Sequence, residues 1–311
     1  MVKPVKRQIR GIFLLTLTAF IWGTAFVAQR KGMEHVGPVT FLGVRFLIAT
    51  VSLLPVICAR SLFSKNIKSP GSSELASLTR LHLIRGGMFC GAVIFACGVF
   101  QQIGIMYTTV GKSGFITTLY IVIVPIFGLS LGQRMKWYAW CCVCIAIAGM
   151  YILCVNEAVS INRGDVLTLF CAVFYAVHIL LVDHYAPLTD GVKLSCAQFF
   201  VCGCLGLIAA FIFEKPELPA IFSAWATLLY TGVLSSGVAF TLQILGQRDV
   251  NPAAASLIMS LEAVFAILMG WLLLDEILTA REIFGCALIF SANVAVQLSG
   301  AMNDTDSRSN S

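Results

Sequence analysis

Residues 113–131 read SGFITTLYIVIVPIFGLSL, a run of 19 residues that contains no charged side chain. A helix of this length measures about 28 Å at 1.5 Å per residue, close to the ~30 Å thickness of the hydrocarbon core of a bilayer. The run lacks the alternation of apolar and polar residues that marks a barrel strand, and it is about twice as long as such a strand. We therefore predict that residues 113–131 form a membrane-spanning helix.

Similar runs make up most of the chain, which has 311 residues, 59% of them hydrophobic and 12% charged, with a mean hydropathy of +0.90. An average soluble domain is roughly a quarter charged, so the composition excludes a soluble globular enzyme. The fold class that we predict is an all-α polytopic membrane protein with ten transmembrane helices. The expected spans are residues 11–28, 39–59, 84–105, 113–131, 137–155, 164–182, 194–213, 221–245, 253–274 and 280–299.

The distribution of basic residues predicts how these spans are oriented. If the N-terminus lies in the cytoplasm and the ten spans alternate, 14 of the 21 Lys and Arg residues fall inside and 6 outside, while Arg45 lies within a span. Basic residues accumulate on the cytoplasmic side of membrane proteins, so we expect both termini there. No Lys/Arg cluster lies on a soluble element, and we therefore expect no nucleic-acid partner. The polar residues 300–311 are expected to form a disordered cytoplasmic tail.

An internal repeat relates the two halves of the chain. A shift of 143 positions lays Thr108–Cys154 on Asn251–Gln297 without a gap, and a shift of 153 lays Trp22 on Tyr175 and Arg45 on Gln198. Five helices per half is an odd number, so the first repeat (residues 1–155) and the second (156–299) would be inverted relative to each other. Inverted repeats around a midplane site are typical of secondary transporters. The identities are few, and chance similarity between apolar stretches is the alternative.

Three short motifs give the chain a family resemblance. They are Phe20-Ile21-Trp22-Gly23, Gly114-Phe115-Ile116-Thr117-Thr118-Leu119-Tyr120 followed by Pro125, and Leu261-Glu262-Ala263-Val264-Phe265 leading to Asp275-Glu276. In their order and spacing they resemble the drug/metabolite transporter superfamily, specifically bacterial EamA-type carriers of the inner (plasma) membrane. The resemblance implies transport of amino acids, metabolites or drugs. Ala263 departs from the family pattern, which usually has proline there, and this puts a kink in that helix in doubt.

Two charged residues fall within predicted spans, where a central charge costs about 2.5–3.5 kcal/mol on insertion scales. Glu262 lies nine residues into 253–274, about 13 Å deep at 1.5 Å per residue, where a carboxyl group could take up and release a proton during transport. It could equally be a fixed partner of Arg45 or of backbone groups. Arg45 could extend its long side chain to the outer interface, or face the pathway and pair with Glu262 or with an anionic substrate.

The other candidate residues for binding are polar and aromatic. Trp22 and Tyr175 lie near the midplane, whereas tryptophan usually lies at the membrane interface, so they could line a cavity; a lipid-facing or packed core ring is the alternative. His178, one turn beyond Tyr175, could relay protons or be a hydrogen-bonded core residue. Serine and threonine hydroxyls can contact a substrate or bond to carbonyls of their own helix. The hydroxyl candidates are Thr117, Thr118 and Tyr120.

Together these features predict a secondary transporter that moves a small-molecule substrate across the lipid bilayer by alternating access, with protons as a candidate coupling ion. The alternative is an intramembrane enzyme acting on a lipid-linked substrate, but the spans show one well-buried carboxylate and no HExxH motif or paired acids. The 12 cysteines lie within apolar stretches or at the end of one and read as small hydrophobic residues, so we expect no metal and no cofactor. One chain could enclose a pathway, which favours a monomer.

Overall fold

A computed structural model of the chain describes residues 5–64, 73–108, 110–132, 137–154, 162–274 and 279–309. These residues form helices joined by short turns and contain no strand. The helices are α1 (Val5–Gly32), α2 (Pro38–Ser64), α3 (Ser73–Tyr107), α4 (Val110–Thr118), α5 (Tyr120–Ser130), α6 (Trp137–Cys154), α7 (Arg163–Tyr185), α8 (Gly191–Phe213), α9 (Leu218–Ser223), α10 (Trp225–Leu229), the π-helix η1 (Tyr230–Ala239), α11 (Phe240–Gln247), α12 (Pro252–Met259), α13 (Leu261–Leu274) and α14 (Ala280–Ser309).

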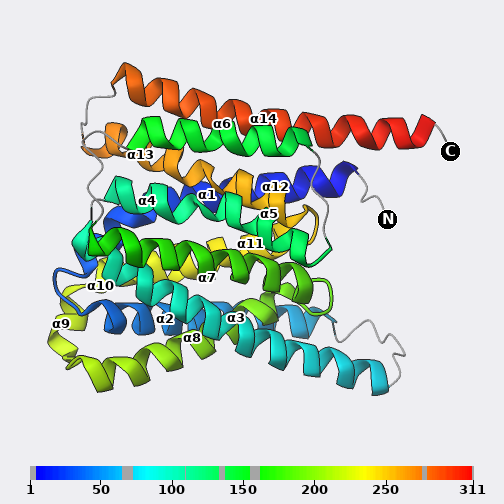
Figure 1. Ribbon diagram of the computed structural model, residues 1–311. Coiled ribbons are helices and arrows are strands. Elements are labelled where there is room, and N and C mark those ends of the chain that lie inside the picture. Colours follow the sequence, from blue (N-terminus) through cyan, green and yellow to red (C-terminus); the bar gives the residue numbers. More distant parts are fainter. Residues whose placement is uncertain are drawn as a thin grey trace.

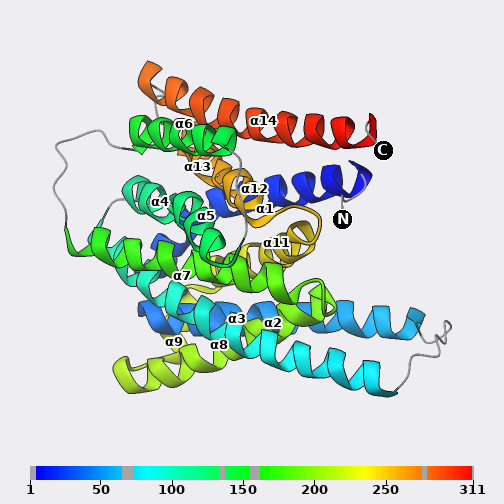
Figure 2. The same cartoon turned by 45° about the vertical axis from the view of Figure 1, so that its right-hand side comes forward.

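The long helices run side by side as one bundle (Figure 1). Both ends of the chain lie on the same side, which we call the terminal face: α1 begins there at Val5 and α14 ends there at Ser309. The short helix α9 lies on the opposite side, which we call the α9 face. α6 and α14 pack together along one edge of the bundle, and α2, α3 and α8 form the opposite edge (Figure 2).

Eight helical stretches in the described part of the chain are long and apolar enough to cross a membrane. They are Lys6–Gly32, Pro38–Leu62, Ser77–Tyr107, Ser113–Ser130, Arg163–Tyr185, Gly191–Phe213, Trp225–Gln247 and Pro252–Met269, and each overlaps a predicted span. The other two predicted spans, 137–155 and 280–299, correspond to the shorter apolar helices Trp137–Ile152 and Ile283–Ala295. The all-helical membrane architecture is confirmed, and the count of ten spans stays a prediction.

Two of the spans are irregular at one residue near their middle, one in each half of the chain, although Leu119 and Ser260 keep right-handed helical dihedral angles. α4 ends at Thr118 and α5 begins at Tyr120, while α12 ends at Met259 and α13 begins at Leu261. A hydroxyl bonds to its own helix beside each break: Thr118 donates to the Phe115 carbonyl at 2.8 Å and Ser260 to the Leu257 carbonyl at 2.7 Å. Such bonds compete with the helix ladder and bend it. The second interruption lies at Ser260, three residues before Ala263, which stands where the family pattern has proline.

Polar residues secure several helix ends. Asn162 and Asp165 form a reciprocal capping box at the start of α7, and Asn251 caps α12 with Pro252 in the first turn, as the preference of proline for that position predicts. The start of α2 is held from across the bundle, because the Glu214 carboxylate at the end of α8 accepts bonds from the backbone N–H groups of residues 39 and 40 at 2.9 and 2.8 Å.

The last helix continues beyond the residue at which the sequence predicts it to end. α14 extends to Ser309, so residues 300–309 are helical where we expected a disordered tail. Once a helix is nucleated, each added residue needs only one more bond to extend it, and polar residues can therefore prolong it. The motif residues Asp275 and Glu276 lie outside the described residues.

The contact between α1 and α13 depends on Gly23, where an added Cβ would lie 2.7 Å from the Glu262 carbonyl oxygen and 2.8 Å from the Ala266 nitrogen. Both atoms belong to the backbone and cannot rotate away. We predict that Gly23→Ala lowers the free energy of unfolding by about 1–3 kcal/mol, as overpacking does.

Gly114→Ala is the matched control, since a Cβ on that helical glycine meets nothing within 4 Å. Alanine favours a helix over glycine by up to about 1 kcal/mol, so this variant should unfold at the wild-type temperature or above it. Thermal unfolding of the purified variants in detergent measures both. Equal midpoints for Gly23→Ala and wild type would contradict the proposed contact.

Candidate functional site

A cavity lies between helices from both halves of the chain, at the centre of the bundle. The gaps between its side chains, together with the part that opens to solvent, amount to about 510 Å³. On α1 the cavity extends from Trp22 to Gln29, that is, from mid-bundle toward the α9 face. Its walls consist of Trp22, Phe26, Gln29, Arg45, Phe46, Ile94, Cys97, Gly98, Gln101, Thr117, Tyr175, Ser235, Phe240 and Glu262.

Aromatic rings from three helices form the floor of this cavity. Trp22 packs edge-on against Tyr175, with ring centroids 5.8 Å apart, and against Phe240 at 4.8 Å. The two residues that the repeat aligns, Trp22 and Tyr175, therefore meet directly. The Trp22 indole N–H donates to the Ser235 carbonyl oxygen at 3.0 Å, within the π-helix η1. Single π-helical turns occur often at functional sites, and here the turn lies against the cavity wall. We refer to these three rings as the aromatic layer.

Arg45 is buried, with 4% of its surface exposed. Its guanidinium donates to the Gln29 side-chain oxygen at 2.7 Å, and Gln102 donates to the same oxygen at 2.5 Å. The Nε atom of Arg45 has no hydrogen-bond partner, and no carboxylate in the described part of the chain lies within 4.0 Å of the guanidinium. Of the two interpretations from the sequence, the structure shows the one in which Arg45 faces the cavity. A buried cation held only by neutral groups is suited to bind an anion.

Glu262 lines the same cavity from the first turn of α13 and is 4% exposed. The first turn of a helix favours a negative charge. The Tyr120 hydroxyl interacts electrostatically with this carboxyl group but has no hydrogen-bond partner of normal geometry. The Thr117 hydroxyl, also on the cavity wall, is likewise without a partner. A ligand in the cavity would therefore find the unused Thr117 hydroxyl on the same cavity wall as Glu262.

The structure brings five of the eight predicted site residues to the cavity wall: Trp22, Arg45, Thr117, Tyr175 and Glu262. The other three do not line this cavity, and a contact between them and substrate stays a prediction. The Thr118 hydroxyl bonds to its own helix and to the Met150 sulfur at 2.7 Å. Tyr120 packs behind Tyr175, with ring centroids 5.1 Å apart. His178 lies one turn past Tyr175, where its Nε2 atom pairs with the Gln198 side-chain oxygen at 3.0 Å.

Sequence reasoning missed several wall residues. Phe26 and Gln29 follow Trp22 at spacings of four and seven residues, which places them on the same helix face, and this spacing could have identified them. Phe240 carried no such signal, because its role depends on packing against α1 and α7. Cys97 reaches the wall as a thiol whose Sγ atom lies 3.4 Å from that of Cys171 on α7. The described residues hold no group of three or more His, Cys, Asp or Glu side chains suited to a metal ion.

Comparison with known proteins identifies the family. The model of the EamA-like transporter family matches residues 9–155 and 162–296, the two halves of the chain. A crystal structure of a protein superposes with a TM-score of 0.75 at 16% sequence identity, and the match covers 94% of this chain and 98% of that one. At this identity the likeness shows that the fold is shared.

Similar proteins from several organisms are also named as transporters. A protein of Archaeoglobus fulgidus named an uncharacterized transporter is 30% identical over 91% of this chain and 84% of its own. YedA of Escherichia coli K12, named an uncharacterized inner membrane transporter, is 25% identical over 94% and 92%. A probable terminal-alkyne amino-acid exporter of Streptantibioticus cattleyicolor is 24% identical over 90% of each chain. These names indicate transporters rather than enzymes, and the chain is a multi-pass membrane transporter that belongs to the EamA-like transporter family.

Proposed function

We propose that this transporter moves a small zwitterionic solute, an amino acid or a close derivative, by alternating access. One observation carries the proposal: a buried arginine and a buried glutamate line one cavity without pairing with each other. In the described residues no ion pair joins Arg45 to Glu262. Burying single charges is costly unless each acquires a partner. A molecule with a carboxylate and an ammonium group would supply both partners at once.

The rest of the wall is suited to the side chain of such a solute. Phe26, Phe46 and Phe240 provide apolar faces, and Trp22 adds a ring whose N–H is already bonded within the protein. Ligand sites of this kind combine mostly apolar walls with a few polar groups that fix orientation. The name of the Streptantibioticus cattleyicolor relative, an amino-acid exporter, points to the same class of solute.

The proposed mechanism rests on two inverted five-helix repeats. α6 and α14, whose apolar parts are short, would complete ten spans together with the eight longer ones. Arg10, Arg60 and Arg248 lie at the terminal face, which the positive-inside rule would place in the cytoplasm. The cavity would then open to the outside in this conformation. One chain encloses the cavity, and we propose that it works as a monomer in the plasma membrane.

Proton coupling through Glu262 is part of the proposal. The carboxyl group is buried, lines the cavity and adjoins Tyr120. A proton and a substrate ammonium would compete for the same carboxylate, and this competition would link their movements. His178, the other residue we considered for proton transfer, lies behind the aromatic layer and pairs with Gln198.

The direct test is uptake of tritiated leucine, phenylalanine and methionine, and of the amines that lack their carboxylate, into liposomes containing the purified protein. We expect uptake of the amino acids and little uptake of the amines. Uptake of amines alone would refute a zwitterionic substrate. Absence of uptake and of exchange for every compound would remove amino acids as substrates.

We predict that Arg45→Gln raises the KM for the transported amino acid by about 10- to 100-fold, since a hydrogen bond to a charged group contributes about 1.5–3 kcal/mol. The same variant should also show a lower ratio of amino-acid uptake to amine uptake. Arg45→Lys should recover part of the affinity, because lysine keeps the charge but not the bidentate geometry. A KM equal to that of wild type in Arg45→Gln would show that the guanidinium does not contact the substrate.

We further predict that Glu262→Gln abolishes accumulation driven by a proton gradient and retains exchange of labelled for unlabelled amino acid. The amide keeps the shape of the carboxyl group but cannot take up the proton. Glu217→Gln, a change on an exposed residue at the start of α9, is the matched control and should behave as wild type. Normal gradient-driven accumulation by Glu262→Gln would exclude Glu262 from coupling.

A further inference from the structure

Buried polar groups without partners continue on the other side of the aromatic layer, toward the terminal face. They are the Nδ1 atom of His178, the Nε2 atom of Gln198, both amide atoms of Gln243 and the Oε1 atom of Gln247. All four side chains are almost completely buried. Buried polar side chains normally find hydrogen-bond partners, so a cluster of unused groups needs an explanation.

His178 and Gln198 contact each other next to the aromatic layer, and Gln243 and Gln247 follow Phe240 on one face of α11. The His178 ring lies 6.0 Å from the Phe240 ring and pairs with Gln198 at 3.0 Å. Gln243 and Gln247 follow Phe240 on α11, about 4.5 and 10.5 Å nearer the terminal face at 1.5 Å per residue. Gln247 donates to the Ile179 carbonyl oxygen, next to His178, at 3.2 Å. We call these four residues the polar track.

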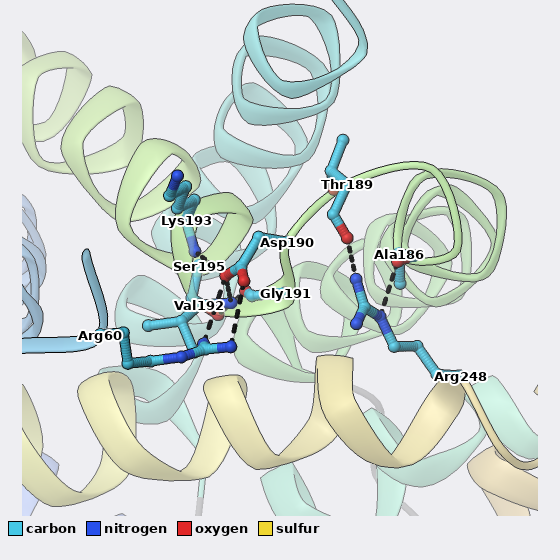
Figure 3. Close-up of polar contacts among 9 residues, drawn as sticks. All are labelled: Arg60, Ala186, Thr189, Asp190, Gly191, Val192, Lys193, Ser195 and Arg248. Carbon is cyan, nitrogen blue, oxygen red and sulfur yellow. Dashed lines mark hydrogen bonds and ion pairs between the residues drawn. The ribbon is translucent and has the colours of Figure 1, made fainter. Parts of the chain in front are cut away.

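Charged side chains close the terminal end of the polar track. Arg248, next to Gln247, donates to the Ala186 carbonyl at 2.6 Å and to that of Thr189, and Arg60 pairs with Asp190 at 3.2 Å (Figure 3). Arg10 pairs with Asp249 at 2.6 Å. The two ion pairs join helices of the first half to segments of the second. They lie at a solvent-accessible surface, since the side chains of Arg10 and Arg60 are 59% and 57% exposed.

The internal repeat relates the polar track to the open cavity. The shift of 153 that aligns Trp22 with Tyr175 also aligns Arg45 with Gln198 and Phe46 with Phe199. The rings of Phe46 and Phe199 lie 5.6 Å apart. Arg45 is on the cavity side of the aromatic layer, and Gln198 is on the terminal side. In a transporter with inverted repeats, the half-pathway on one side has a counterpart on the other.

We infer that the polar track is the closed half of the translocation pathway: in the opposite conformation the ion pairs separate, the aromatic layer opens, and His178, Gln198, Gln243 and Gln247 line a hydrated passage. The inference rests on the proposed transport function. Water and solute would then supply the hydrogen bonds that these groups lack here. The four residues of the track carry amides and one imidazole, whereas arginine and aspartate side chains lie at its terminal end. The stretch between these charged groups and the aromatic layer is therefore suited to a solute with no net charge.

The test replaces Gln243 by leucine, which has nearly the same size. Because neither amide atom of Gln243 has a partner here, Gln243→Leu should unfold at the wild-type temperature or above it, and leucine, phenylalanine and methionine should protect it against heat as they protect wild type. Uptake should nevertheless fall at least 10-fold, because the passage loses a polar contact. Asn293→Leu is the matched control: Asn293 is buried on α14 with a partnerless Oδ1 atom, away from the track, and its uptake should be that of wild type.

Uptake by Gln243→Leu at the wild-type rate would overturn the inference. If wild type itself transports none of the three amino acids, the proposed function fails first, and the two failures are distinguished. A second measurement covers a variant that does not fold. Gln243→Cys should react during turnover with a membrane-impermeant maleimide added at the terminal face, as detected by mass spectrometry of that peptide, and absence of reaction would also overturn the inference.

Discussion

The cost of leaving a polar group unpaired in an apolar medium governs this molecule at every level. It requires backbone groups inside the bilayer to bond within helices, so the described chain is a bundle of helices. The same cost applies to side chains: Arg45 turns inward to Gln29 rather than toward lipid, and Glu262 faces the same cavity. Polar groups inside membranes face cavities or one another and mark functional pathways. In this bundle the buried charged side chains Arg45 and Glu262 both line the cavity.

Irregular backbone lies next to the cavity and has local causes. The breaks between α4 and α5 and between α12 and α13 lie beside hydroxyls that bond to their own helices, and η1 replaces regular α-helix beside Trp22. Non-helical backbone at membrane depth is tolerated where it is buried in protein or lines a cavity. Thr117 and Glu262, on the cavity wall, each lie two residues from one of these irregular positions. In the π-helix η1, the Ser235 carbonyl oxygen accepts the hydrogen bond from the Trp22 indole N–H.

The bundle is open on the side of the α9 face and closed on the side of the terminal face. Space lies between the aromatic layer and the α9 face, while the terminal side is closed by two ion pairs, by the bonds of Arg248 and by packed amides. An exposed ion pair such as Arg60–Asp190 contributes about 0–1 kcal/mol, whereas the Asp249 carboxylate in the pair with Arg10 is only 6% exposed. Trp22, Tyr175 and Phe240 pack together between the two sides.

Length, hydropathy and the repeat were enough to predict a helical membrane protein in two halves, because the requirement for backbone hydrogen bonding in lipid leaves few alternatives. They also identified Trp22, Arg45, Thr117, Tyr175 and Glu262 as polar or aromatic residues at unusual depth. Which side each residue faces is set by packing between helices far apart in the chain. The tertiary structure was therefore needed to show that Arg45 faces inward and that the Thr118 hydroxyl bonds to its own helix. It was also needed to show that Phe240 packs against Trp22 and that His178 lies on the far side of the aromatic layer.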